Sequence, residues 1–217
     1  MDHARLVQEV IEHRERLGPM GKFAAYRRRL LGAIAAAPFA LPGLGWAQGK
    51  TPLPPLIDGG PYVPTPEVIV SRMLELADVR RSDFVVDLGS GDGRLVIEAA
   101  RRYGARGLGV EREARLVELA RAAAGKARVA DRVTFRQGDI FDTDLRGATV
   151  VTLYLLPRLL VHLQPKLRAE LAPGARIVSH DYPLDSWRAD RALEFDVPEK
   201  EAQMLPPLTQ LFLYVVR

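Results

Sequence analysis

The segment Asp87-Leu88-Gly89-Ser90-Gly91-Asp92-Gly93 places three glycines and two acids at the junction of two predicted elements. The short apolar run Asp83-Phe84-Val85-Val86 precedes it and is typical of a buried parallel strand. Residues 94–103 follow with helical periodicity, which stops at Gly104, a residue suited to ending a helix. A glycine-rich turn between such elements lets backbone N–H groups and a helix N-terminus approach a ligand closely. The segment therefore predicts a ligand-binding turn.

The next two predicted strands also end near acidic residues. Residues 106–110 are short and apolar and lead into Glu111, which lies 18 residues after Gly93 (111 − 93). An acid at the tip of the second strand can accept hydrogen bonds from both ribose hydroxyls of a nucleotide. The third predicted strand, 132–136, is followed by Gly138-Asp139-Ile140. These strand ends together indicate a site for a nucleoside-containing cofactor.

The glycine spacing differs from the G-x-G-x-x-G fingerprint of nicotinamide-binding folds. It resembles motif I, D-x-G-x-G-x-G, of the class I seven-β-strand methyltransferases, which use S-adenosylmethionine. In that family an acid at the position of Asp139 receives the adenine amino group. The resemblance implies that S-adenosylmethionine is the cofactor. The residues that it implies as cofactor-binding are Thr65, Asp87, Gly89, Gly91, Gly93, Glu111, Asp139 and Ile140.

Four further strings narrow the resemblance. They are Pro61-Tyr62-Val63-Pro64-Thr65-Pro66, Tyr154-Leu155-Leu156-Pro157, Pro165-Lys166-Leu167 and Ile177-Val178-Ser179-His180. The combination is similar to the protein lysine methyltransferases that include the mitochondrial ATP synthase c-subunit and adenine nucleotide translocase enzymes, with archaeal relatives. The similarity spans residues 61 to about 187 and implies direct in-line methyl transfer to a lysine side chain of a protein. A small-molecule or lipid-like acceptor is the main alternative, and a non-enzymatic S-adenosylmethionine-binding module is the third.

Tyr154 is the candidate catalytic residue, because it follows the predicted strand 148–153 at the point where the transferred methyl group would lie. The alternative is a tyrosine that packs on the cofactor without chemistry. Enzymes that methylate adenine or glutamine nitrogen usually carry an Asn/Asp-Pro-Pro-aromatic string here, and this chain has none, which disfavours those acceptors. His180 ends another predicted strand and could face the site, although an ordinary hydrogen-bonded histidine is the favoured interpretation.

Composition excludes several kinds of chemistry. The 217 residues contain no cysteine, so there is no disulfide, thiolate zinc site or cysteine nucleophile. The four histidines show no metal-ligand spacing, and no metal site is predicted. The net charge of +4 belongs to residues 1–50, because residues 51–217 hold 23 basic and 23 acidic residues. A neutral domain without a basic stripe argues against a nucleic-acid partner.

Residues 1–50 form a predicted N-terminal extension. Arg27-Arg28-Arg29 precedes an uncharged stretch, 30–47, in a pattern typical of a signal peptide or a twin-arginine export signal. We expect membrane contact through residues 22–47 or export to the periplasm, with a cytoplasmic location as the alternative, and Met20 as a possible true start. Export conflicts with the cytosolic origin of S-adenosylmethionine. A Pro-rich linker, 51–61, leads to the methyltransferase domain, 62–217.

The order of elements predicts a doubly wound, Rossmann-like α/β fold with its ligand at the carboxyl ends of the strands. Thr65 is expected to cap a helix over 66–77. The remaining predictions are strands at 84–88, 106–110, 132–136, 148–153 and 175–180, helices at 93–103, 113–124 and 158–171, and final strands near 192–197 and 210–216. The last strands should form the antiparallel end of a seven-stranded mixed sheet.

Overall fold

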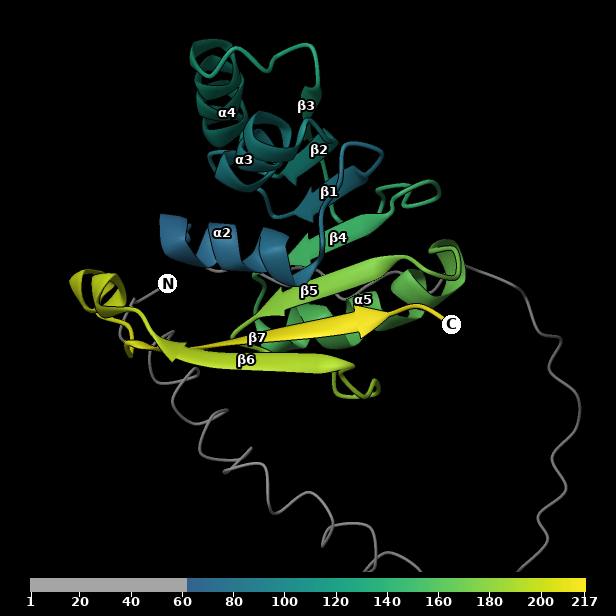
Figure 1. The fold of residues 1–217 in the computed structure, drawn as a ribbon. Helices are drawn as coiled ribbons and strands as arrows, with labels where there is room; N and C mark the ends of the chain where they lie inside the picture. Colours follow the sequence, from purple (N-terminus) through teal and green to yellow (C-terminus); the bar gives the residue numbers. More distant parts are fainter. Residues whose placement is uncertain (1–61) are drawn as a thin grey trace, which may run out of the picture. The chain divides into compact units, whose positions relative to one another are not determined.

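The computed structural model of the chain describes residues 62–217. The predicted extension 1–50, its membrane-contacting part 22–47 and the linker 51–61 lie outside the described residues. Helices and strands mostly alternate along the described part, except that β4 follows β3 and β6 follows β5 without a helix between them (Figure 1). They are α2 (Glu67–Leu76), β1 (Phe84–Leu88), α3 (Arg94–Tyr103), β2 (Arg106–Glu111), α4 (Ala114–Lys126), β3 (Val133–Gln137), β4 (Val150–Leu153), α5 (Pro157–Glu170), β5 (Arg176–His180), β6 (Arg191–Asp196), the 3₁₀ helix η3 (Pro198–Gln203) and β7 (Leu208–Val215).

The seven strands form one mixed sheet in the order β3-β2-β1-β4-β5-β7-β6. The first five are parallel to one another, and β7 runs antiparallel to both β5 and β6. The doubly wound fold with an antiparallel C-terminal strand is therefore confirmed. The chain moves outward on one side of β1 to β2 and β3, then returns to β4 on the other side. Such a reversal opens a crevice at the carboxyl ends of β1 and β4, where ligands bind in folds of this kind.

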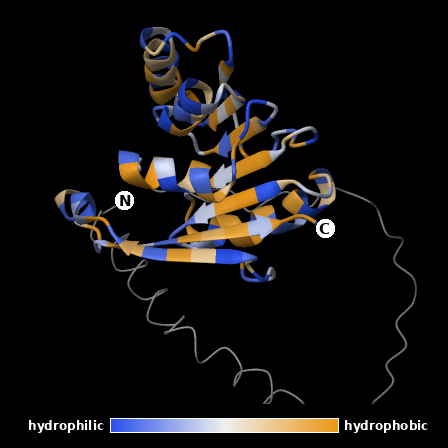
Figure 2. Cartoon of the chain, in the orientation of Figure 1, coloured by the Kyte–Doolittle hydropathy of each residue, from blue (hydrophilic) through white to orange (hydrophobic). Residues whose placement is uncertain are grey.

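Helices cover both faces of the sheet (Figure 1). One core joins the apolar faces of α2, α3 and α4 to strand residues such as Val85, Val150 and Val178. Because side chains alternate across a strand, Val86, Val151 and Ile177 point to the opposite face, where α5 contributes buried leucines. Figure 2 shows hydrophobic residues concentrated on the central strands, whereas β6 begins and ends with hydrophilic ones.

Predicted and observed elements differ in a few places. The predicted bounds lie within two residues of the observed ones, but η3 was not predicted. The prediction that Thr65 caps the first helix was wrong, because α2 begins at Glu67 with Pro66 as its N-cap and no side-chain cap hydrogen bond. The carbonyl of Pro66 accepts the N–H groups of Ile69 and Val70 instead. Among residues 62–217, no helix is long and apolar enough to cross a membrane.

Candidate active site

The glycine turn connects β1 to α3 in a conformation that requires glycine. Gly89, Gly91 and Gly93 have φ values of +81°, +53° and +79°, a region that costs other residues energy. A Cβ on Gly91 would lie 2.4 Å from Cε2 of Tyr62, and one on Gly93 would lie 2.4 Å from Cε1 of Phe135. Tyr62 and Phe135 thus pack against the turn at Gly91 and Gly93. A ligand can approach the backbone of the turn closely only because the glycines have no Cβ atoms.

Glu111, at the end of β2, reaches across to this turn. Its Oε2 atom accepts the N–H of Gly91 at 2.9 Å. Its Oε1 atom accepts the N–H groups of Arg112 at 2.8 Å and Glu113 at 2.9 Å. A carboxylate offers about four acceptor positions, so these bonds fix the group and leave capacity for a ligand hydroxyl. The structure therefore brings Glu111 and the glycine turn together, as the sequence predicted.

Asp87 is buried at the carboxyl end of β1 and accepts the hydroxyl of Thr152, on the adjacent β4, at 2.7 Å. Burial raises the pKa of Asp87 to about 7, and the charges of Glu111 and Asp92 act in the same direction, against the Thr152 hydrogen bond. Nearby, the Ser90 hydroxyl is buried with no hydrogen-bond partner among the described residues. The carboxyl end of β1 and the turn after it therefore carry polar groups that contacts within the described residues only partly satisfy.

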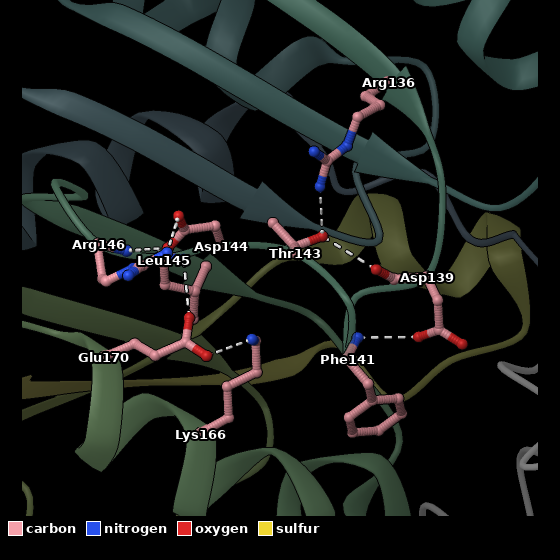
Figure 3. Close-up of polar contacts among 9 residues, drawn as sticks. All are labelled: Arg136, Asp139, Phe141, Thr143, Asp144, Leu145, Arg146, Lys166 and Glu170. Atoms are coloured by element: carbon pink, nitrogen blue, oxygen red, sulfur yellow. Dashed lines mark hydrogen bonds and ion pairs between the residues drawn. The ribbon is translucent and has the colours of Figure 1, made fainter.

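Asp139 and Ile140 lie in the connection after β3, which hydrogen bonds hold in place (Figure 3). The exposed Asp139 accepts the N–H of Phe141 at 2.8 Å, and its carbonyl accepts the Thr143 hydroxyl at 2.9 Å. Farther along, Glu170 of α5 accepts the N–H of Leu145 at 2.9 Å. The half-buried Ile140 follows Asp139 directly. Hydrogen bonds at both ends of the connection therefore fix the position of Asp139 after β3.

Tyr154 follows β4 directly, and its ring stacks on His180 at the end of β5. The ring centroids are 3.9 Å apart and the planes are inclined by 30°. Burial first, and then the charges of Asp181 and Tyr182, raise the pKa of Tyr154 well above its usual range. Neither ring nitrogen of His180 has a hydrogen-bond partner among the described residues, so the interpretation as an ordinary hydrogen-bonded histidine was wrong. The structure thus brings together two uncharged aromatic side chains at the carboxyl ends of β4 and β5.

A short strap, residues 62–66, lies over the glycine turn. Arg94 at the start of α3 donates to the carbonyl of Thr65 at 2.7 Å and forms an ion pair with Asp92 at 2.6 Å. The Tyr62 ring covers Gly91, and burial together with the charge of Asp92 raises its pKa to about 12. Thr65 therefore lies close to the turn through its backbone. Sequence reasoning missed Arg94, whose only signal is its place directly after the last glycine.

These residues suit an adenosyl cofactor. The turn leaves no room for a Cβ, the Glu111 carboxylate stands at the next strand end, and the Asp139 carboxylate stands beyond the third. A seven-stranded sheet of this order with a glycine turn after its first strand defines a Rossmann-like methyltransferase fold. The predicted site residues from Asp87 to Tyr154 lie at or just after the carboxyl ends of β1, β2, β3 and β4, and Thr65 joins them through the hydrogen bond from Arg94 to its carbonyl. Their roles toward the cofactor stay predictions.

Comparison with known proteins identifies the family. A model described as the ANTKMT methyltransferase domain matches residues 87–191. A protein-lysine N-methyltransferase of Saccharolobus islandicus (strain REY15A) is 42% identical over 137 residues, which are 63% of this chain and 85% of that protein. The adenine nucleotide translocase lysine N-methyltransferase of Mus musculus is 38% identical over 146 residues, covering 63% of each chain. The chain thus spans most of the archaeal relative but less than two thirds of the mouse one.

A solved structure shows the same relationship in three dimensions. The crystal structure of an RNA methyltransferase from Salinibacter ruber, in complex with S-adenosyl-L-homocysteine, is 48% identical with a TM-score of 0.64. The match covers 71% of this chain and 94% of that one. The chain belongs to the ANTKMT-type family of methyltransferases, and the resemblance inferred from the sequence motifs is confirmed.

Proposed function

We propose that the chain transfers the methyl group of S-adenosylmethionine to lysine side chains of a protein. The observation that carries this proposal is the 42% identity to an archaeal protein-lysine N-methyltransferase over 85% of its length. The translocase and ATP synthase c-subunit enzymes carry lysine N-methyltransferase names as well. We assign the cofactor to Thr65, the glycine turn with Asp87, Glu111, and Asp139 with Ile140.

The chemistry is a direct displacement. When bound, the cofactor supplies a methyl carbon attached to a positively charged sulfur. The lone pair of the lysine Nζ forms a bond to that carbon while the C–S bond breaks. The bonding electrons stay on sulfur, giving the uncharged thioether, and the positive charge passes from the sulfur to the methylated nitrogen. Holding two reactants in line contributes most of the rate in such a reaction.

The lysine must lose a proton before it attacks. From a reference pKa of about 10.4, this costs roughly 4.6 kcal/mol at pH 7. A sulfonium about 4 Å away contributes on the order of 4 kcal/mol at an effective dielectric of 20. An apolar, uncharged surrounding acts in the same direction. The stacked rings of Tyr154 and His180 supply such a surrounding, so this chain needs no carboxylate base at the methyl-transfer point.

RNA is a second candidate acceptor, because the similar Salinibacter ruber protein is named an RNA methyltransferase. Charge argues against it, because residues 51–217 hold equal numbers of basic and acidic side chains, whereas nucleic-acid sites are strongly basic. A small-molecule acceptor is the other alternative. The predicted export or membrane segment at residues 22–47 lies outside the described residues and stays a prediction.

The test is to incubate the full chain with methyl-labelled S-adenosylmethionine and a lysate of the source cells. The lysate is then separated into protein, RNA and small-molecule fractions. We expect label in discrete protein bands that yields methyl-lysine after acid hydrolysis. Label confined to RNA or to small molecules would overturn the lysine proposal and identify the acceptor class.

Two variants show whether the label depends on the assigned site. Glu111→Ala removes the carboxylate that holds the Gly91 N–H, and we expect it to abolish labelling and weaken cofactor binding by about a hundredfold or more. Glu118→Ala removes an exposed acid on α4 that pairs with Arg121, and it should label like the wild type. Retained micromolar cofactor affinity in Glu111→Ala would contradict the assignment of Glu111.

A further inference from the structure

Three titratable side chains, those of His180, Asp181 and Lys200, form a cluster next to the Tyr154 ring, and His180 and Lys200 are buried. His180 has no exposed surface, and its Nε2 atom lies 3.5 Å from Oδ2 of Asp181. The same Oδ2 atom accepts a hydrogen bond at 2.7 Å from Nζ of Lys200, a residue of η3 that is only 2% exposed. A lysine is almost never buried unless it is paired. The ammonium group of Lys200 is therefore part of this cluster.

The position of Asp181 is fixed from several sides. Its φ is +60°, a left-handed conformation that is unusual for a residue with a side chain. Its N–H donates to the carbonyl of Gln210 at 2.7 Å, and its Oδ1 accepts the N–H of Gln210 at 3.1 Å. Strain of this kind persists where the surroundings impose it, and it gathers at functional sites. Here β7 holds the carboxylate between the imidazole and the ammonium.

The hydrogen bonds of Lys200 complete the arrangement. Besides Asp181, its Nζ donates to the Thr209 hydroxyl at 3.1 Å and to the Leu208 carbonyl at 3.3 Å. These three acceptors match the three donors of an ammonium group. The charge of Lys200 thus balances that of Asp181, and Asp181 is not left as an unpaired anion beside His180.

His180 consequently sits in surroundings that favour the uncharged ring. The titratable groups that act on it are Tyr154 after β4, Asp181 after β5 and Lys200 on η3, and Tyr182 acts on the stacked Tyr154. Its partner in the β5–β7 register is the apolar Leu211. Burial lowers the pKa of His180 to about 4; Lys200 acts in the same direction, and Asp181 opposes them.

We propose that His180 is a positioning residue of the methyl-transfer site, where its uncharged ring holds Tyr154 in place, and that Lys200 keeps the ring uncharged by neutralising Asp181. This inference rests on the proposed function, in which an amine meets the sulfonium beside Tyr154. An imidazolium behind Tyr154 would repel both the sulfonium and the ammonium form of the substrate. Because the cluster keeps His180 uncharged at physiological pH, protonation of His180 would not slow methyl transfer there.

The first test follows the charge of His180 directly and needs no acceptor. In the full chain, imidazole NMR signals are followed from pH 4 to pH 8, and His180→Phe assigns the signal among the four histidines. We expect wild-type His180 to stay uncharged above about pH 5. In Lys200→Met, Asp181 faces the ring unpaired, and the midpoint should rise by at least about one pH unit. Lys200→Gln asks the same question if Lys200→Met does not fold.

A wild-type midpoint near the ordinary histidine value, or an unchanged midpoint in a folded Lys200 variant, would overturn the proposal. Lys166→Met is the matched control, because Lys166 forms a part-buried ion pair with Glu170 at 2.5 Å on α5. It should leave the His180 titration unchanged.

The second test measures turnover on whichever acceptor the labelling experiment identifies. His180→Ala removes the stacked ring, and we expect kcat to fall roughly tenfold with little change in cofactor Kd. His180→Phe keeps an uncharged ring and should stay within about threefold of wild type, like the exposed control His162→Phe. In Lys200→Met, the fall of kcat toward low pH should begin at a higher pH than in the wild type. In the double variant Lys200→Met/His180→Phe this shift should be absent.

Equal turnover in His180→Ala and the wild type would show that His180 does not position Tyr154. An acceptor other than lysine would refute the proposed function while leaving this comparison intact. Absence of labelling with intact cofactor binding would refute both the proposed function and the positioning role, and the NMR titration would still decide the role of Lys200.

Discussion

At the scale of single residues, the ionised side chain of Asp87, a candidate cofactor-binding residue, lowers the stability of the folded protein. Its carboxyl group is buried at the end of β1, and burial raises its pKa from 3.8 to about 7. A raised pKa means that the folded state binds the proton more tightly than the unfolded state does. Its contribution to stability is then fully present below about pH 4 and is lost as the pH rises through about 7.

Asp87→Asn should remove this pH dependence. Between about pH 4 and pH 7, Asp87 lowers the wild-type free energy of unfolding by up to about 1.4 kcal/mol per pH unit. The variant should therefore melt at a higher temperature than the wild type at pH 8, and the difference should vanish near pH 4. Thermal unfolding at intervals across this range measures the effect. Parallel curves for the two proteins would contradict the raised pKa.

At the scale of elements, the glycine turn depends on what lies beside each glycine. Gly93 packs against Phe135 of β3 and Ala120 of α4, both buried. Gly91 packs against Tyr62, a residue that is 39% exposed and can move away. The two positions therefore share a backbone conformation and differ in how readily a neighbour can give way.

Gly93→Ala should cost far more stability than Gly91→Ala. Both substitutions place a side chain at positive φ, at about 1–2 kcal/mol. Only Gly93→Ala adds overpacking against a fixed core, at roughly 1–3 kcal/mol more. Urea denaturation of the two variants measures the difference. Adding Tyr62→Ala to Gly91→Ala should recover part of its loss, and equal losses in the two single variants would contradict this packing argument.

At the scale of the whole molecule, a second polar cluster lies at the edge of the sheet opposite to the site. Asp83, just before β1, forms a hydrogen-bonded ion pair with Arg176 of β5 and accepts the Thr149 hydroxyl at 2.7 Å. Arg176 also donates to the carbonyls of Ala77 at 2.7 Å and Asp78 at 2.9 Å, at the end of α2. This cluster joins elements distant in sequence at the amino ends of the strands.

Asp83→Asn should therefore separate stability from function. Breaking a buried ion pair by removing one partner costs about 3–5 kcal/mol, so urea denaturation should show a loss of that order. Cofactor affinity per folded molecule should not change, because the site lies at the other ends of the strands. Asp144→Asn is the control, since its exposed pair with Arg146 should contribute far less. A large loss of affinity in folded Asp83→Asn would show that the two edges are coupled.

The sequence determined the fold and the placement of the candidate cofactor residues. Residues 84–88 and 106–110 are apolar runs of strand length. The glycine turn directly follows the first run, and Glu111 directly follows the second. Because parallel strands end at one edge of a sheet, local signals of this kind suffice to place those residues together. The family resemblance carried by the same motifs was confirmed.

Only the tertiary structure decided the environment of the side chains. Lys200 contacts Asp181 from an unpredicted 3₁₀ helix, and His180 stacks on Tyr154, which follows the adjacent strand, and has no hydrogen-bond partner within residues 62–217. Thr65 does not cap α2, because the helix begins at Glu67, one residue later than the sequence pattern predicted. Burial and pairing are set by contacts between distant segments, and no local pattern of residues records which segments meet.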